Sequence, residues 1–210
     1  MRKCALLPAV AVLVGRLASA EEPLPAGQII DDVQSRADAS QHYSLYLPSN
    51  FTPERKWPVI LVFDAGGRGR RGVERYQAGA EAYGYIVAGS NNARNGPWEV
   101  STDAARAMHA DVASRFALDS MRLYTAGMSG GARVAMMLAL TPELVTGTRG
   151  SKVAGVLASS AGFPPYDAHE SVGFPIFASA GTDDFNHYEM MALDRDVKTP
   201  HRVEVFEGGH

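Results

Sequence analysis

Continuous apolar runs alternate along this chain with segments of helical period. Residues 58–64, Pro-Val-Ile-Leu-Val-Phe-Asp, are apolar up to Asp64 and rich in β-branched side chains, which is typical of a buried strand in a parallel sheet. In residues 41–48, apolar and polar positions alternate around Tyr43 and Leu45, which predicts a half-buried strand. These signals place strands at residues 28–33, 41–48, 58–64, 85–90, 122–125, 153–159, 174–180 and 201–206.

Helical segments separate most of these strands, at residues 73–83, 102–116, 132–140 and 187–194. The second helix is expected to carry its apolar residues on one stripe, formed by Ala105, Met108, Val112 and Phe116. Ser101 or Thr102 is expected to cap its N-terminus. Strand–helix alternation predicts one α/β domain, with a mostly parallel sheet, helices on both faces and the first two strands as an antiparallel edge.

Residues 127–131, Gly-Met-Ser-Gly-Gly, interrupt an apolar strand and precede a small-residue helix. A G-x-S-x-G pattern between a strand and a helix predicts a nucleophile elbow, with Ser129 in a strained backbone conformation. Gly127 and Gly131 lack side chains that would collide where strand and helix meet. The alternative is a glycine-rich turn with an incidental serine.

The carboxyl ends of parallel strands meet at one edge of a sheet, where ligands bind. The loops that follow the strands therefore form a set: residues 64–71, 91–98, 127–131, 160–165, 181–186 and 207–210. They bring a serine, glycine-rich backbone, acidic residues and a histidine to one rim.

A serine hydroxyl needs a base to take its proton, and the base needs an orienting acid. We favour His210 as the base, because it follows the last strand in a Gly-Gly turn, with His187 as the alternative. His201 begins a strand and is interpreted as a surface residue. Of the adjacent acids Asp183 and Asp184, which point in opposite senses, we favour Asp184. Asp64 and Asp167 are weaker candidates because neither follows a strand expected to carry the acid.

An oxyanion needs two N–H donors. Gly130 is expected to supply one, and Ala65 or Gly66 the other. Residues 66–69 superficially resemble a phosphate cradle, but no Lys-Ser/Thr ending follows, and the chain has neither a Cys/His cluster nor an HExxH pattern. We therefore expect no cofactor and no metal.

Aromatic residues in the rim loops are candidates for binding substrate. Trp98, Phe163 and Phe185, together with Tyr166, could line a groove, although Trp98 and Phe163 could equally be packing residues. Only residues 160–173 separate two consecutive strands where a cap would be inserted, and they include Pro164-Pro165 and two glycines. This segment predicts a loop and no cap domain.

Composition sets the remaining limits. The chain has 210 residues, of which 46% are hydrophobic and 20% charged, as suits one globular domain. Its first twenty residues are interpreted as a secretory signal, with a basic start, an apolar stretch too short to span a membrane, and Ala18-Ser-Ala20 as the cleavage site. The single cysteine, Cys4, lies in that segment, so residues 21–210 form no disulfide.

The expected signal segment contains three basic residues and no acidic ones. Its removal would leave a mature chain with 17 basic and 23 acidic residues, a net charge of −6. That balance argues against a nucleic-acid partner. We expect export to the periplasm or the medium, with no stable membrane anchor.

The chain resembles an exported α/β-hydrolase of the esterase group that includes polyhydroxybutyrate depolymerases, feruloyl esterases and dienelactone hydrolases. The resemblance covers most of the mature chain, and its most specific segment is the elbow. The matching segments are residues 43–48, 58–67, 124–133, 178–186 and 206–210. It implies the α/β-hydrolase fold, with the acid of the Gly-x-x-Asp turn at Asp184 and the histidine of the Gly-His turn at His210. The order Ser129, Asp184, His210 is the order of that fold.

Two departures from the group stand out. The first loop reads Asp64-Ala-Gly, where many relatives have His-Gly-x. Relatives also usually continue past the histidine into a final helix, which this sequence lacks; that indicates a fragment or a truncated gene product.

The leading hypothesis is a serine esterase that forms an acyl-enzyme with a Ser129–His210–Asp184 triad and acts on a small or polymer-linked ester. The alternatives are a serine peptidase of the same fold and a non-catalytic binding protein that resembles an α/β-hydrolase.

Overall fold

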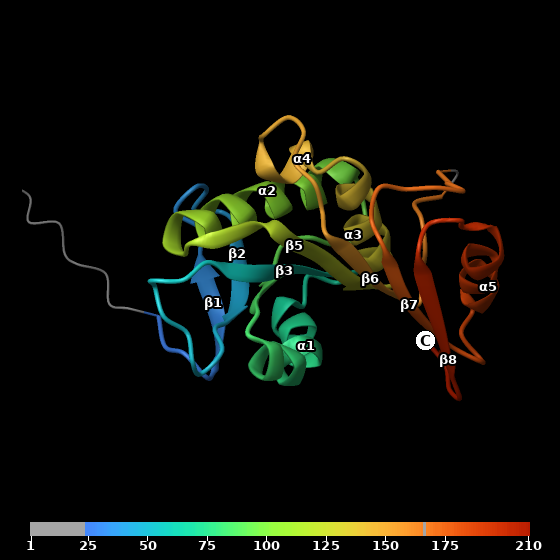
Figure 1. Ribbon diagram of the computed structural model, residues 1–210, viewed down its shortest axis with the longest axis horizontal. Coiled ribbons are helices and arrows are strands. Elements are labelled where there is room, and N and C mark those ends of the chain that lie inside the picture. Colours follow the sequence, from blue (N-terminus) through green and yellow to red (C-terminus); the bar gives the residue numbers. More distant parts are fainter. Residues whose placement is uncertain (1–23, 166) are drawn as a thin grey trace, which may run out of the picture.

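One eight-stranded sheet organises the protein, in the order β1-β2-β4-β3-β5-β6-β7-β8 (Figure 1). The computed structural model describes residues 24–165 and 167–210. The signal peptide expected at residues 1–20 lies outside them. The strands are β1 (Ile29–Gln34), β2 (His42–Tyr46), β3 (Trp57–Asp64), β4 (Ile86–Ser90), β5 (Leu118–Met128), β6 (Gly155–Ser159), β7 (Ile176–Gly181) and β8 (His201–Phe206).

The sheet is parallel from β4 to β8, and β1 and β2 form the antiparallel edge that the alternating pattern predicted. Strand β3 is buried at every position, in agreement with its continuous apolar run. The register pairs Asp64 with Met128, Met128 with Ser159, and Ser159 with Ser179. The loops after β3, β5, β6 and β7 therefore start from one row at the carboxyl edge of the sheet.

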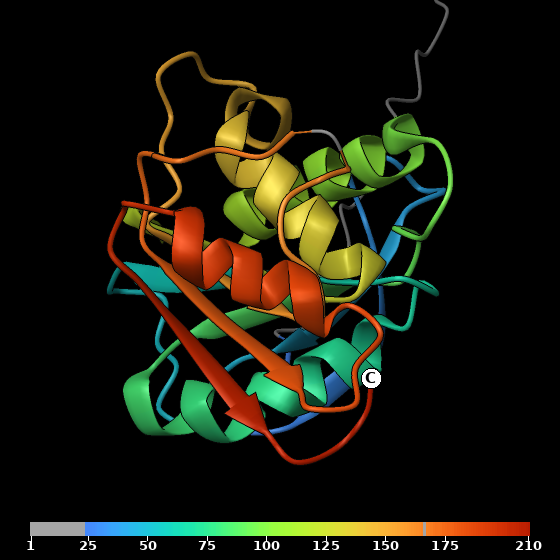
Figure 2. The ribbon, with the colours of Figure 1, turned by 90° about the vertical axis from the view of Figure 1, so that its right-hand side faces the viewer.

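Helices cover both faces, as predicted. Helix α1 lies on one face, and α2, α3 and α4 lie on the other (Figures 1 and 2). An ion pair between Arg133 of α3 and Glu189 of α5 places α5 on the same face as α3. The bounds are α1 (Gly69–Tyr83), α2 (Trp98–Arg115), α3 (Gly130–Leu140), α4 (Glu143–Thr146) and α5 (His187–Asp196).

The larger core cluster lies between the sheet and the α2–α5 face. In it, Ala105, Met108 and Val112 of the predicted stripe are buried, and Phe116 packs against them partly buried. A smaller cluster on the α1 face joins Val62 of β3 to Val73 of α1 and five further buried side chains.

Two local predictions need correction, and one helix was missed. Helix α1 begins at Gly69, inside the segment interpreted as a glycine-rich loop. Helix α2 begins at Trp98 after Pro97, so neither Ser101 nor Thr102 caps it; the buried Ser101 hydroxyl instead donates to Arg94 O at 3.2 Å. The short α4 was not predicted.

Between β6 and β7, the described residues contain no helix or strand. At this point of the fold, the described residues agree with the prediction of a loop in place of an inserted cap. None of the described helices is long and apolar enough to cross a bilayer.

Candidate active site

Ser129 lies in the sharp turn between β5 and α3 and has φ 56° and ψ −126°. Such a conformation is strained for a residue with a side chain. Glycines on both sides make the turn possible. A Cβ on Gly127 would lie 2.2 Å from Gly131 O, and one on Gly131 would lie 2.2 Å from Phe63 O. The Ser129 N–H donates to Ser159 O at 2.8 Å, which anchors the turn to β6. The predicted elbow is confirmed as a backbone structure.

Asp184 and His210, in the turns that follow β7 and β8, contact each other. His210 Nδ1 lies 3.0 Å from Asp184 Oδ1, which also accepts the Asn186 N–H at 2.8 Å. The Asp184 side chain is fully buried, whereas that of His210 is 25% exposed. The Phe185 ring stacks on the imidazole with centroids 4.1 Å apart. This arrangement favours the imidazole tautomer with the proton on Nδ1, which leaves Nε2 free to accept one.

Asp183, the other candidate acid, makes no side-chain hydrogen bond to His210 within the described residues. Its side chain is exposed, and its backbone N–H donates to Gly208 O at 2.8 Å. That bond ties the turn carrying the acid to the turn carrying His210.

Asp184 is held ionised in spite of its burial. Burial alone would raise the pKa of this carboxyl, but interactions with the Ser160 side chain, His210 and the Asn186 N–H outweigh it and lower the pKa. Asp184 Oδ2 is buried and accepts no hydrogen bond of regular geometry. The Ser160 side chain thus lowers the pKa of Asp184 without donating a hydrogen bond of regular geometry to Oδ2.

No hydrogen bond joins His210 to Ser129 among residues 24–165 and 167–210; His210 pairs with Asp184 alone. Hydrogen bonds of this kind are often long without substrate and shorten in the reacting complex.

The other candidate histidines make structural contacts. His187 Nδ1 lies 2.9 Å from Gly181 O at the start of α5. His201 lies within hydrogen-bonding distance of Thr199 O and Asp194 O. Its side chain is 17% exposed, so His201 lies partly at the surface, where the sequence predicted a surface residue.

The other candidate acids also have structural partners. Asp167 lies 2.9 Å from the His169 ring and is exposed. Asp64 is buried and accepts hydrogen bonds from Arg68 Nε at 2.7 Å and from the Gly66 N–H at 2.8 Å. Burial opposes the ionisation of Asp64, yet these bonds lower its pKa below the ordinary value.

The loop after β3 narrows the choice of the second oxyanion donor. The Gly66 N–H is already bound to Asp64 Oδ1. Within the described chain, the N–H groups of Ala65 and Gly130 have no protein acceptor. Gly130 is the first residue of α3, where N–H groups are free and the helix dipole favours negative charge. The geometry therefore favours Ala65 over Gly66.

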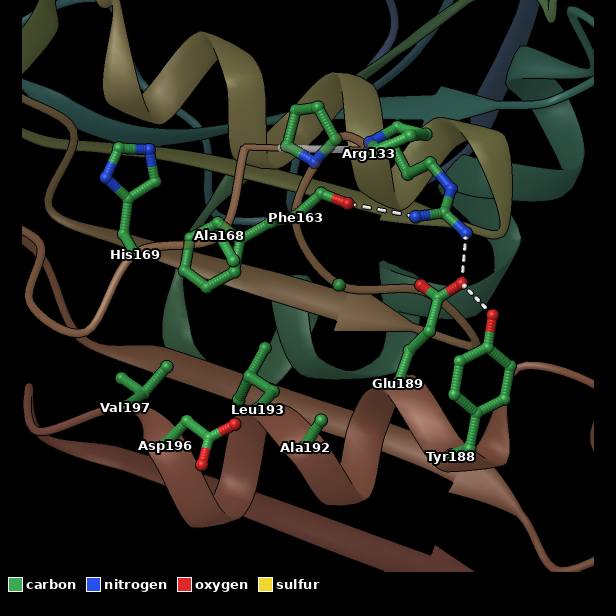
Figure 3. Close-up of a pocket in the computed structure, with 13 residues that line it drawn as sticks. Arg133, Phe163, Ala168, His169, Tyr188, Glu189, Ala192, Leu193, Asp196 and Val197 are labelled. Carbon is green, nitrogen blue, oxygen red and sulfur yellow. Dashed lines mark hydrogen bonds and ion pairs between the residues drawn. The ribbon is translucent and has the colours of Figure 1, made fainter.

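The three aromatic candidates lie in different surroundings. Phe185 is 68% exposed over His210, and Trp98, the first residue of α2, is 39% exposed. Phe163 lines a cavity of about 510 Å³ between α3, α5 and the segment after β6 (Figure 3). Arg133 reaches from α3 into this region and binds Phe163 O at 2.9 Å and Glu189 at 2.7 Å. The cavity is mainly apolar, and Ser129 does not line it.

Sequence reasoning missed three residues near the site: Asn95, Ser160 and Asn186. The contact of Asn186 with Asp184 could have been predicted, because an Asp side chain often accepts a hydrogen bond from the backbone N–H two residues later. Ser160 has φ 58° and is buried, which nothing in its residue type indicates. Asn186 Nδ2 donates to Ser160 O at 2.8 Å and so joins the acid turn to the end of β6.

No three His, Cys, Asp or Glu side chains gather as a metal site in the part of the chain that the structure describes.

Comparison with known proteins identifies the fold. Searches against protein-family models and against curated protein sequences find no match. Solved structures do match: Thermogutta terrifontis esterase 2 phosphonylated by sarin aligns at a TM-score of 0.63 and 14% identity, over 90% of this chain and 87% of that one. An esterase from Pyrobaculum calidifontis aligns at 0.62 and 14% identity, over 89% and 78%. A ferulic acid esterase aligns at 0.59 and 19% identity, over 87% and 90%.

The chain therefore has the α/β-hydrolase fold, as its sequence resemblance implied. Structural similarity at sequence identities below 20% establishes the fold alone. The activity must be argued from the residues of the site.

Proposed function

We propose that this protein is a serine hydrolase that cleaves carboxylic esters through an acyl-enzyme. The observation that carries the proposal is the backbone of Ser129, a non-glycine residue at φ 56° held between two glycines at the N-terminus of α3. Strain of this kind persists where function requires it. The esterases among the similar solved structures support ester hydrolysis as the chemistry.

In the proposed mechanism, Ser129 Oγ attacks the ester carbonyl carbon while His210 Nε2 accepts the hydroxyl proton. The carboxylate of Asp184 holds the imidazole and stabilises its positive charge. Collapse of the tetrahedral intermediate breaks the bond to the alkoxy group, which leaves as an alcohol with the proton from His210. A water molecule then attacks the acyl-serine by the same route and regenerates Ser129.

The negative oxygen of the intermediate is assigned to the N–H groups of Gly130 and Ala65. Neither group has a protein acceptor among the residues that the structure describes, and both belong to turns at the carboxyl edge of the sheet. Preorganised donors of this kind need not be reoriented as charge develops.

For the substrate we propose bulky or polymer-linked esters, as in the polyhydroxybutyrate depolymerase and feruloyl esterase group. The segment after β6 contains no helix or strand among its described residues, so nothing resembling a cap covers the rim there. Phe185 and Trp98 are exposed at the rim and could contact such a substrate.

Labelling with a fluorophosphonate probe tests the function, because the probe reacts with an activated serine. We expect stoichiometric labelling of Ser129, lost in Ser129→Ala, together with hydrolysis of short-chain p-nitrophenyl and feruloyl esters. A folded protein that takes up no label would be a non-catalytic binding protein. A protein that labels but cleaves only amides would be a peptidase.

We also propose that residues 1–20 direct export and are removed, leaving residues 21–210 as the hydrolase domain. N-terminal sequencing of the exported protein from a bacterial host tests this, and recovery of the chain only inside cells with Met1 intact would contradict it.

A further inference from the structure

Asn95 lies in the loop between β4 and α2, and its side chain is packed against Gly130. A Cβ on Gly130 would lie 1.7 Å from Asn95 Oδ1, 2.8 Å from its Cγ and 3.3 Å from its Nδ2. The amide therefore occupies the space directly beside the residue whose N–H is assigned to the oxyanion.

The backbone of the same residue is bound to the other half of the proposed oxyanion site. The Asn95 N–H donates to Ala65 O at 2.9 Å, and the neighbouring Arg94 forms an isolated antiparallel bridge with Gly66. The Ser101 hydroxyl of α2 donates to Arg94 O, which anchors the loop to a buried helix residue. Asn95 is thus fixed between Ala65 and Gly130.

The Asn95 amide has no hydrogen-bond partner within residues 24–165 and 167–210, and Asn95 is exposed at the rim. A primary amide carries two N–H donors and one acceptor oxygen. Its oxygen lies toward the Cα of Gly130, where a weak C–H···O contact is possible. The two N–H donors of Asn95 Nδ2 therefore remain available to bind a group of the substrate that lies beside Gly130.

We propose that Asn95 is a further catalytic residue, whose side-chain amide donates a third hydrogen bond to the oxyanion alongside Gly130 and Ala65. The inference rests on the proposed function, since it needs an acyl group on Ser129. Loss of one side-chain donor of this kind lowers kcat by about 10² to 10³-fold. Because the bond strengthens as charge develops, the loss falls on kcat and leaves KM nearly unchanged.

Two variants remove the donor and keep the backbone bond to Ala65. Asn95→Ala deletes the amide, and Asn95→Asp keeps its shape but replaces the donor with a charge that repels an oxyanion. We expect kcat to fall about 10² to 10³-fold in Asn95→Ala and further in Asn95→Asp. Arg94→Ala is the matched control, because it alters the same loop through an exposed side chain and keeps its backbone bridge; it should stay within about threefold of wild type.

A transition-state analogue separates a catalytic role from a structural one. A trifluoromethyl ketone adds to Ser129 and forms an oxyanion, so its inhibition constant should rise with the loss in kcat/KM across the Asn95 variants. Melting temperatures close to wild type should show that the loop is intact. If Asn95→Ala retains kcat within about threefold, or loses rate through KM alone, the inference is wrong while serine labelling still supports the hydrolase. If the wild-type protein neither labels nor hydrolyses esters, the proposed function and this inference are both wrong.

Discussion

Replacing Asp184 by asparagine should disable the enzyme that we propose while leaving its fold in place. In the native site, Asp184 Oδ1 accepts two hydrogen bonds, from the Asn186 N–H at 2.8 Å and from His210 Nδ1 at 3.0 Å. An amide group has one acceptor atom and one donor atom where the carboxylate has two acceptors. If its NH₂ group faces His210, the imidazole must carry its proton on Nε2, and that nitrogen can no longer accept the proton of Ser129.

The opposite orientation of the amide is also unfavourable. It keeps an oxygen toward His210 but places the NH₂ group at the position of Oδ2, which is buried and has no regular hydrogen-bond acceptor. It also removes the negative charge that stabilises the imidazolium. By analogy with other triads, Asp184→Asn should lower kcat by about 10⁴-fold, which corresponds to about 5 kcal/mol of transition-state stabilisation.

Asp183→Asn is the matched control, because it makes the same chemical change in the adjacent, exposed residue. Its backbone bond to Gly208 O does not involve the side chain, so we expect kcat within a few-fold of wild type. Steady-state hydrolysis of a p-nitrophenyl ester, with circular dichroism to verify folding, measures both. A loss below about tenfold in Asp184→Asn, or an equal loss in the two variants, would remove Asp184 from the role of orienting acid.

Three further outcomes follow from other parts of the structure. Asp111→Ala should lower the free energy of unfolding in urea by about 3–5 kcal/mol, because it removes the carboxylate that binds Tyr43 OH at 2.6 Å and the buried Arg115 guanidinium at 2.7 Å; a loss below 1 kcal/mol would contradict this. Because the folded pKa of Asp184 lies below its ordinary value of 3.8, its ionisation contributes stability at neutral pH that is lost as pH falls from about 4 through the folded pKa. Acid titration of wild type against Asp184→Asn should therefore show a shallower fall in stability for the variant, and equal slopes would contradict the assignment. A soluble ester assayed across its solubility limit should show no jump in rate, since the described residues between β6 and β7 form no cap; a sharp activation would reveal a mobile lid.

The fold could be predicted because its signals are local. A continuous apolar run such as Trp57–Asp64 can be satisfied only by burial on both faces, and the structure buries all of it. The approximate bounds of most strands followed from such runs or from alternation, but β5 spans Leu118–Met128, where only residues 122–125 were predicted. The start of α1 did not, because glycines at positions 69 and 72 indicate a loop when they are considered alone.

The site could be predicted in part, for a related reason. The parallel topology alone brings the ends of β5 and β7 together, so Ser129, Asp184 and His210 could be chosen from their order along the chain. Asn95 and Ser160 could not, because their roles depend on contacts between loops. The same holds for Gly66, whose N–H is bound by Asp64, a residue first considered only as a candidate acid.

Glycines allow close contacts between the backbone segments that carry the proposed oxyanion donors, and one of these glycines also misled the prediction of α1. A Cβ on Gly69 would lie 2.1 Å from Gly89 O, so α1 begins where it does because its first turn packs directly on β4. That contact, with the Gly131–Phe63 approach and the Asn95–Gly130 contact, clamps the loops after β3 and β4 against the start of α3. The donors assigned to the oxyanion lie on these three segments. A methyl group at any of these glycines would force the segments apart, and for donors that must stay aligned on one oxygen a shift of about 1 Å is costly. Gly69, one of the two glycines that concealed the start of α1 from sequence reasoning, is therefore also one of the glycines that would hold the proposed site in register.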